Sequence, residues 1–407
     1  MSISMKYDFD KIIDRRGKDA TAIDGIGKKV WGVSPDSAKS GFSEIPMWVA
    51  DMNFETSPSI TRALEERIRH PLYGYFLPSE RYYDSIIRWQ TRLHGYEGLT
   101  PEVIGYENGV HGCIMTSIAT LTEPGEAVFL HSPAYLGFLA DLKSSGREAV
   151  VSPLKKDENG VWRMDFEDME KKLKSHNIRL AIFCSPHNPS GRVWERWELD
   201  RAMELFRDND CTVISDEIWS DIVFEGKKHI PTSMVSEDAK NRTISLYAPS
   251  KTFNLAGLIG SYHIIFNPLL RERIRRHGER TQYNEMNVLS MHALIGAYED
   301  EGYEWLGELL KVLERNCRYA VNYINENFEG CSVSMPEATY MLFMDCSDFL
   351  KERGITLDDL LKAGWDIGVK YQDGRAFAWQ DAVRINAALP ESLLKEAFDR
   401  LSKYVFS

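Results

Sequence analysis

The stretch LAIFCSPHNPSGRVWERWELDRAMELFRDNDCTVISDE, residues 180–217, contains two short apolar runs on either side of an amphipathic segment. The run 180–186 is apolar at most positions, and the run 211–217 contains Cys211, Val213 and Ile214. Such runs are typical of strands that are buried on both faces. The segment 195–209 between them has the length and the spacing of apolar residues expected for a helix. Strand, helix and strand in this order predict a parallel β-α-β unit.

Similar segments continue on both sides of this unit. Further buried strands are predicted at 127–131, 149–154, 243–250 and 261–266, and a further amphipathic helix at 165–176. Apolar strands that alternate with helices predict an α/β domain with a largely parallel sheet between helices. Because open sheets of this kind bind ligands at the carboxyl ends of their strands, the loops after residues 184, 214 and 248 are candidate binding segments.

The pattern changes near residue 286. Helices are predicted at 286–300 and 303–328, a strand near 338–345, a β-ribbon-like stretch at 367–385 and a C-terminal helix at 390–404. A chain of 407 residues exceeds what one hydrophobic core usually serves. We therefore predict two domains: a large α/β domain over residues 55–285, and a smaller α+β domain made of residues 1–54 together with 286–407.

Composition excludes several classes of protein. The net charge of −12 argues against nucleic acid or an anionic membrane surface as the main partner. No run approaches the roughly 18 apolar residues of a spanning helix, and the N-terminus lacks a secretion signal, so a cytoplasmic location is predicted. The six cysteines and ten histidines are scattered without the spacing of metal ligands, and no metal site is indicated.

Lys251 directly follows the apolar run 243–250 and lies between Ser250 and Thr252. Burial at a strand end would lower the pKa of its amine, and the neutral amine is the form that attacks an aldehyde. Taken alone, the position also suits an ordinary loop lysine.

Two other strand ends carry polar residues. Asp216 lies near the end of the run 211–217, where a buried carboxylate needs a partner such as a protonated pyridine nitrogen. A capping or salt-bridged aspartate is the alternative. Asn188 follows the run 180–186 and could donate to a ring oxygen from a loop fixed by prolines. The segment Asn108–Gly112 precedes a predicted helix at 114–121 and could cradle a phosphate with its backbone amides.

The order of these motifs is specific. The chain contains Asn-Gly-Val (108–110), Pro-x-Tyr (133–135), Pro-His-Asn-Pro-x-Gly (186–191), Ser-Asp-Glu-Ile (215–218), Ser-Lys-Thr-Phe-Asn-x-Ala-Gly (250–257) and Arg-Ile-Asn (384–386). This order resembles the fold-type-I pyridoxal-phosphate (PLP) enzymes, the class I/II aspartate aminotransferase superfamily. The segments 46–54 and 73–75 further resemble its MalY/PatB/cystalysin-like cystathionine β-lyase subgroup. The resemblance covers essentially the whole chain and implies a seven-stranded, mostly parallel sheet plus a smaller α+β domain.

The resemblance implies pyridoxal 5'-phosphate as the cofactor and assigns a role to each motif. Lys251 would form the Schiff base and then move the α-proton, Asp216 would pair with the pyridine nitrogen, and Tyr135 would stack on the ring. Further cofactor contacts would come from Gly109, Val110, His111, Asn188, Trp219 and Ser250. In a homodimer with shared active sites, Tyr75 of the partner subunit would complete the set. The amino-acid substrate would contact Arg384, Ala50 and Asn188, with Arg384 clamping its carboxylate.

Several positions depart from the family pattern. Residue 219 is Trp where relatives have Tyr or His, Ala248 stands where many carry a phosphate-binding Ser, and His111 replaces a small or apolar residue. The glycine-rich stretch that usually precedes the substrate arginine is replaced by residues 377–382, and its Asp381 could pair with Arg384. These departures affect the substrate more than the cofactor.

The motifs allow more than one reaction. The subgroup resemblance favours a carbon–sulfur β-lyase that converts cystathionine- or cysteine-type amino acids to pyruvate, ammonia and a thiol. The same lysine would serve an aminotransferase of an L-amino acid. A regulatory binding protein with residual PLP activity is a third possibility, because some relatives bind a transcription regulator.

Overall fold

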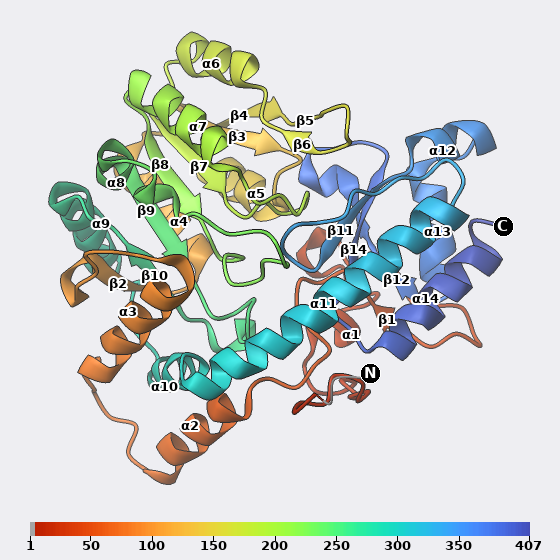
Figure 1. Cartoon of the computed structure of the whole chain (residues 1–407), viewed down its shortest axis with the longest axis horizontal. Coiled ribbons are helices and arrows are strands. Elements are labelled where there is room, and N and C mark those ends of the chain that lie inside the picture. Colours follow the sequence, from red (N-terminus) through yellow and green to blue (C-terminus); the bar gives the residue numbers. More distant parts are fainter. Residues whose placement is uncertain (1–4) are drawn as a thin grey trace. The chain divides into compact units, whose positions relative to one another are not determined.

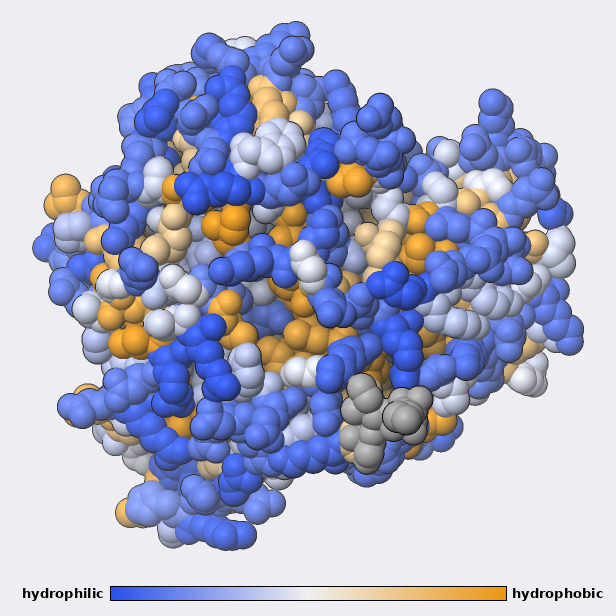
Figure 2. Space-filling view, in the orientation of Figure 1, coloured by the Kyte–Doolittle hydropathy of each residue, from blue (hydrophilic) through white to orange (hydrophobic). Residues whose placement is uncertain are grey.

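The computed structural model describes residues 5–407, which form two compact units. The first, called the sheet unit here, comprises Thr56–His187 and Arg192–Gly307. The second, called the C-terminal unit, comprises the residues up to Glu55, Asn188–Gly191 and Glu308–Ser407. Hydrophilic side chains cover most of the face of both units drawn in Figure 2.

The sheet unit is built on seven strands in the order β2-β10-β9-β8-β7-β3-β4 (Figure 1). Their bounds are β2 (Ile104–Glu107), β3 (Ala127–Ser132), β4 (Glu148–Pro153), β7 (Leu180–Cys184), β8 (Thr212–Asp216), β9 (Thr243–Tyr247) and β10 (Ser261–Ile264). Only β10 runs in the direction opposite to the other six strands, so the predicted mostly parallel sheet is confirmed. The six predicted strands are present, whereas the edge strand β2 was not predicted.

Helices follow the predicted alternation. The sheet unit contains α2 (Pro58–Arg69), α3 (Glu80–His94), α4 (Val110–Leu121), α5 (Leu136–Ser144), α6 (Phe166–Ser175), α7 (Arg196–Asp208), α8 (Glu237–Arg242), α9 (Pro268–Thr281), α10 (Val288–Ala297) and a small hairpin of β5 (Lys155–Lys156) and β6 (Trp162–Arg163). Capping explains why α7 begins one residue later than predicted: Glu195 and Glu198 form a reciprocal capping box at its start.

The core fixes α4 on the sheet. Val110, Cys113, Ile114 and Ile118 of this helix belong to one buried apolar cluster with side chains of β3, β7, β8 and β9. Burial of such side chains is the main stabilising contribution to a domain of this kind. The amino-terminal end of α4 is therefore held in a defined place relative to the carboxyl ends of the neighbouring strands.

The compact units divide at a different place from the predicted domains. The division falls after Gly307, within α11 (Asp300–Asn327), instead of at 285/286. The reason is packing, because α10 contacts α2 and α3 of the sheet unit. Gly296 of α10 approaches the backbone of α2 so closely that an added Cβ would lie 2.7 Å from the Ser59 carbonyl oxygen.

The C-terminal unit contains the three-stranded sheet β11-β14-β13 and the parallel pair β1-β12. Its elements are α1 (Thr21–Asp24), β1 (Ile45–Pro46), β11 (Met341–Asp345), α12 (Ser347–Arg353), α13 (Leu357–Asp366), β12 (Val369–Lys370), β13 (Gln372–Asp373), β14 (Ala382–Asn386) and α14 (Glu391–Tyr404). The predicted ribbon at 367–385 is correct for β13 and β14, which pair antiparallel, but a short 3₁₀ turn at Gly374–Phe377 lies between them.

Within residues 5–407, none of the helices has both the length and the apolar character that crossing a bilayer requires. All six cysteines carry free thiols, and five of them are buried, as expected for small apolar side chains.

Candidate active site

Lys251 and Asp216 lie at the carboxyl ends of two neighbouring parallel strands of the sheet unit. Asp216 is the last residue of β8, and Lys251 lies in the turn that follows β9. Trp219 is fully buried, and the Lys251 Nζ lies 5.7 Å from the centroid of its ring. The structure therefore brings together three of the predicted site residues, at the edge of the sheet where the loops were expected to bind a ligand.

Asp216 is a buried acid whose charge is only partly compensated. Its side chain accepts a hydrogen bond from the Ile218 amide at 3.1 Å, and Lys251 and His111 lie near enough to favour its ionised form. Burial outweighs these effects and raises the pKa of Asp216 to about 6. A cation that binds at this carboxylate would remove the cost of burying the charge.

His111 and Tyr135 form the side of the same cluster. Their ring centroids are 5.4 Å apart, and the His111 Nδ1 lies 2.7 Å from Oδ2 of Asp141 in α5. Burial alone would lower the pKa of His111, but the hydrogen bond to Asp141 and its charge raise it. Gly137 leaves the room that the imidazole occupies, since an added Cβ would lie 2.1 Å from the His111 Cε1. Sequence reasoning missed Asp141.

The predicted phosphate cradle is the start of α4. Gly109 precedes the helix with a φ of 85°, a conformation that favours glycine, and Val110 begins the helix. The first amides of a helix have no partner within the helix and attract anions. Ser250 lies beside Lys251 in the turn after β9, half-buried.

Asp221, which sequence reasoning also missed, anchors the residue after Lys251. Its Oδ2 accepts a hydrogen bond from Thr252 Oγ1 at 2.9 Å, and its Oδ1 accepts from Trp89 Nε1 at 3.2 Å. The His94 Nε2 lies 2.8 Å from the same Oδ1. All four side chains are buried, so the backbone next to Lys251 is tied to α3.

Glu217, the neighbour of Asp216, is a second buried carboxylate. It accepts hydrogen bonds from Tyr247 Oη (2.5 Å), Ser215 Oγ (2.9 Å) and the Thr232 amide (3.0 Å), and it pairs with His229 Nε2 (2.6 Å). Burial acts against its ionisation, but these donors hold the pKa of Glu217 below its ordinary value. The backbone that carries Asp216 is thereby fixed as well.

Arg384 is the centre of a separate group in the C-terminal unit. Its Nη2 donates to Gln372 Oε1 at 2.6 Å and to the Trp48 carbonyl at 3.1 Å, and its Nη1 donates to Asn188 Oδ1 at 3.2 Å. The Phe377 ring centroid lies 4.6 Å from its Cζ. Gln372 stands directly opposite Arg384 in the β13–β14 ladder, so a correct strand register would have predicted this contact.

The remaining predicted residues lie as follows. Asp381 is exposed, and the hydrogen bonds of Arg384 go to the groups above rather than to its carboxylate. Ala50 lies in the C-terminal unit, where its carbonyl accepts from the Tyr340 hydroxyl at 3.1 Å. Tyr75 lies between α2 and α3 with a relative exposure of 111%, and within one chain the structure does not bring it to the Lys251 cluster.

Known proteins share this arrangement of sequence and fold. The family model described as aminotransferase class I and II matches residues 54–401. This chain belongs to that family. Cystathionine beta-lyase PatB from Bacillus subtilis (strain 168) is 33% identical to this chain over 396 residues, which cover 97% of this chain and 98% of PatB. The predicted resemblance to fold-type-I PLP enzymes is confirmed.

Two solved structures have the same fold over nearly their whole length. A PLP-bound putative aminotransferase from Clostridium difficile 630 is 34% identical, with a TM-score of 0.89 over 97% of this chain and 99% of that one. Cystalysin from Treponema denticola, which contains pyridoxal 5'-phosphate, is 28% identical, with a TM-score of 0.89 over 98% of both chains.

Replacement of Asp216 by Asn should make the ligand-free protein more stable at neutral and alkaline pH. The folded-state pKa of about 6 lies above the ordinary value of 3.8, so folding becomes less favourable as the pH rises from about 4 to 6. Above that range the ionised side chain costs the fold on the order of 3 kcal/mol. The thermal midpoint of Asp216→Asn should therefore exceed that of the wild type at pH 8, by less as the pH falls toward 5.

Asp381→Asn is the control, because Asp381 is an exposed aspartate whose neutralisation changes no buried charge. If Asp216→Asn lowers the midpoint at pH 8, the carboxylate is stabilised in the fold and this description of the site is wrong.

Proposed function

We propose that this protein is a PLP-dependent carbon–sulfur β-lyase that cleaves cystathionine- or cysteine-type amino acids to pyruvate, ammonia and a thiol. One observation carries the proposal: the amine of Lys251 and the buried carboxylate of Asp216 lie together at adjacent strand ends, in a chain 33% identical to a cystathionine beta-lyase. The PLP named for the C. difficile protein and for cystalysin supports the same cofactor here.

The residues present fit PLP part by part. A protonated pyridine nitrogen would supply the positive charge that the buried Asp216 needs. The start of α4 after Gly109, with the Ser250 hydroxyl, offers donors for a phosphate. The half-buried ring of Tyr135 offers a face for an aromatic ring, and Trp219 an indole donor for its phenolic oxygen. His111, held by Asp141, adds a side chain of raised pKa beside the cradle.

When bound, PLP withdraws electrons from the Cα of an amino acid and so makes its α-proton acidic. The chain's own residues do the rest. Lys251 would carry the cofactor between turnovers and then, as a neutral amine, take the proton from Cα. Asp216 would keep a proton on the pyridine nitrogen. As the Cβ–S bond breaks, the electron pair left at Cα forms a Cα–Cβ double bond, and the sulfur leaves with the bonding pair of the Cβ–S bond and takes up a proton, which the Lys251 ammonium would supply. The released 2-aminoacrylate would then take up water and give pyruvate and ammonia.

The substrate carboxylate would be held by the Arg384 group. The guanidinium is already oriented by Gln372, Asn188 and the Trp48 carbonyl, and it lies over the Phe377 ring. A buried guanidinium with a fixed direction suits a two-pronged contact with a carboxylate, which a lysine cannot make. Asn188, and Ala50 beside Tyr340, would complete this end of the substrate site.

Purified protein loaded with PLP should release pyruvate from L-cystathionine without any keto-acid acceptor. Lys251→Ala is the control that keeps the fold and removes the base, and it should lose the activity. The putative aminotransferase from C. difficile keeps transamination as the alternative, for which amino-group transfer would require an added keto acid. Conversion of the added keto acid to its amino acid, without release of pyruvate, would contradict the lyase, and no turnover of either kind would leave the regulatory binding role.

Arg384→Lys should lower kcat/KM about tenfold to a few hundredfold, since one or more charge-assisted hydrogen bonds of 1.5–3 kcal/mol each are lost. The visible absorbance of the bound cofactor should not change. Arg375→Lys is the matched control, because Arg375 lies in the same ribbon but is exposed and pairs with Asp373 and Asp358. A wild-type kcat/KM in Arg384→Lys would mean that another group holds the carboxylate.

We further propose a homodimer in which Tyr75 serves the site of the other subunit. The segment between α2 and α3 exposes several large apolar side chains, namely Leu72 (67%), Tyr73 (58%), Tyr75 (111%) and Leu77 (87%). A contiguous exposed apolar segment of this size is typical of a protein interface. Most soluble oligomers are two-fold symmetric, so each subunit would give its Tyr75 and receive one.

Mixing Lys251→Ala subunits with Tyr75→Phe subunits tests the shared site. Random exchange gives heterodimers with one intact site, so activity should return to at most about one quarter of the wild-type value. Each variant mixed with itself is the control. Absence of recovery after verified subunit exchange would contradict the role of Tyr75, although not the lyase activity.

The cytoplasmic location stays a prediction.

A further inference from the structure

In the turn before α4, both backbone polar groups of Asn108 are hydrogen-bonded to side chains. The backbone amide of Asn108 donates to Asn284 Oδ1 at 2.9 Å, and its carbonyl accepts from the Tyr283 hydroxyl. The next amide, of Gly109, donates to the Glu107 carbonyl at 2.9 Å. Residues 283 and 284 thus fix both polar groups of the residue that leads into the first amides of α4.

Glu107 determines which way Asn284 faces. An asparagine amide can rotate to exchange its oxygen and nitrogen, and only its hydrogen-bond partners select one orientation. Asn284 Nδ2 donates to Glu107 Oε2 at 2.6 Å, so Asn284 Oδ1 is left pointing to Asn108. The other carboxylate oxygen, Oε1, lies 2.6 Å from His263 Nδ1. A fully buried glutamate needs such donors, and here they also orient its neighbour.

Two glycines leave the space for this network. A Cβ on Gly112, in the first turn of α4, would lie 1.2 Å from the Tyr283 Oη. A Cβ on Gly105 of β2 would lie 2.2 Å from the His263 Cε1. The packing of Tyr283 and His263 is therefore possible only because these positions carry no side chain.

We infer that Glu107 is a positioning residue: with Asn284 and His263 it fixes the Asn108–Gly109 turn so that the amides at the start of α4 are ready to bind a phosphate. This inference rests on the proposed PLP cofactor. A preorganised set of donors binds its ligand more tightly than a loose one, because less ordering is needed on binding. The effect should therefore be confined to the phosphate part of the cofactor.

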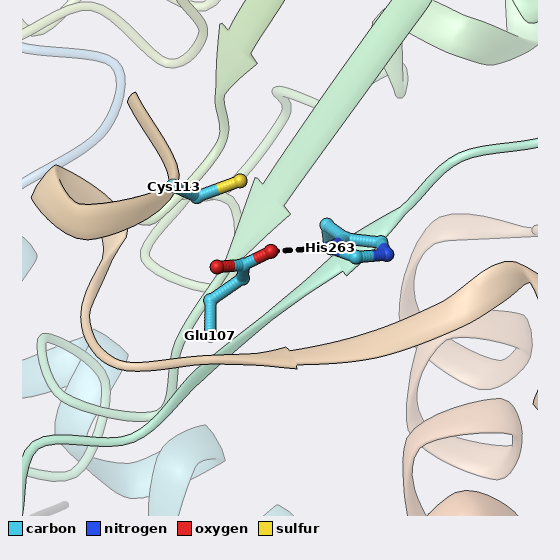
Figure 3. Close-up of side chains that lie close together, drawn as sticks. All are labelled: Glu107, Cys113 and His263. Atoms are coloured by element: carbon cyan, nitrogen blue, oxygen red, sulfur yellow. Dashed lines mark hydrogen bonds and ion pairs between the residues drawn. The ribbon is translucent and has the colours of Figure 1, made fainter. Parts of the chain in front are cut away.

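Figure 3 shows a third side chain, Cys113 of α4, near Glu107 and His263. The ligand atoms of Glu107, Cys113 and His263 lie within 4.8 Å of one another, which is also compatible with a metal ion. Hydrogen bonding accounts for the arrangement without one. Both Glu107 oxygens have donors, and burial, with the nearby Glu107 carboxylate, raises the pKa of the Cys113 thiol and keeps it protonated. A metal remains a distinct outcome of the test.

The experiment compares PLP with pyridoxal, which lacks the phosphate, in titrations of the cofactor-free protein. In Glu107→Ala and Asn284→Asp the Kd for PLP should rise about tenfold to a hundredfold, while the Kd for pyridoxal changes less than about threefold. Glu107→Gln should bind PLP nearly as the wild type does, because the amide can accept from Asn284 and donate to His263. Glu102→Gln is the matched control, an exposed glutamate that precedes the same strand.

Each other outcome overturns the inference. If the Kd values for PLP and for pyridoxal rise equally, Glu107 has a general structural role. If Glu107→Gln binds PLP weakly, the negative charge of Glu107 matters and not the orientation that it gives to Asn284. If Glu107→Ala does not fold, Asn284→Asp and Tyr283→Phe make the same comparison, with thermal midpoints measured alongside. Release of one metal ion per chain by a chelator, with the same rise in Kd for PLP, would replace the hydrogen-bond network by a metal site. If the wild type binds neither PLP nor pyridoxal, the proposed function fails as well. If the wild type binds PLP and cleaves cystathionine but the variants bind PLP as tightly as the wild type, only this inference fails.

Discussion

A carboxylate buried at the end of β8 is the constraint on which the site depends. Asp216 is almost inaccessible to solvent, its pKa is raised to about 6 by burial, and it lies beside the turn that carries Lys251. Burial of such a charge costs stability, so a buried carboxylate without full compensation is typical of functional sites. Binding of a cationic ring at Asp216 would return that free energy, so the same residue that weakens the empty fold would strengthen the loaded one.

Hydrogen-bond networks behind this carboxylate hold the residues around it. Glu217 is fixed by four donors, and Asp221 ties Thr252, the residue after Lys251, to α3. Glu107 and Asn284 likewise fix the turn that begins α4. Three buried carboxylates therefore each support one backbone segment of the candidate site. Fully paired networks of this kind are rigid, and rigidity is what places reacting groups accurately.

Much of the fold could be predicted because most strands of the parallel sheet are short apolar runs that alternate with helices. Strand β2 was missed because IGYE is not apolar, as suits an edge strand. The unit boundary was missed because it depends on the packing of α10 against α2, which are more than 200 residues apart in the chain.

The site divides in the same way. Lys251, Asp216 and Asn188 stand in contiguous motifs, and the sequence alone identified them as candidates. Gln372 was missed because its contact with Arg384 depends on the exact register of the β13–β14 ribbon. Asp141 and Asn284 were missed because their partners are 30 and 177 residues away and are brought close only by the fold. The departures from the family pattern were recognised in the sequence, yet their consequences were not. Asp381, for example, turned out to be exposed, and Arg384 hydrogen-bonds to Gln372 instead.

Lys251 is the residue that we expect to carry the cofactor. Borohydride reduction of the PLP-loaded protein, followed by peptide mapping, tests it most directly, because reduction makes the bond between the lysine and the cofactor permanent. We expect one labelled residue per chain, Lys251, together with loss of the visible absorbance. A label on another lysine, or a protein that takes up no PLP, would contradict it.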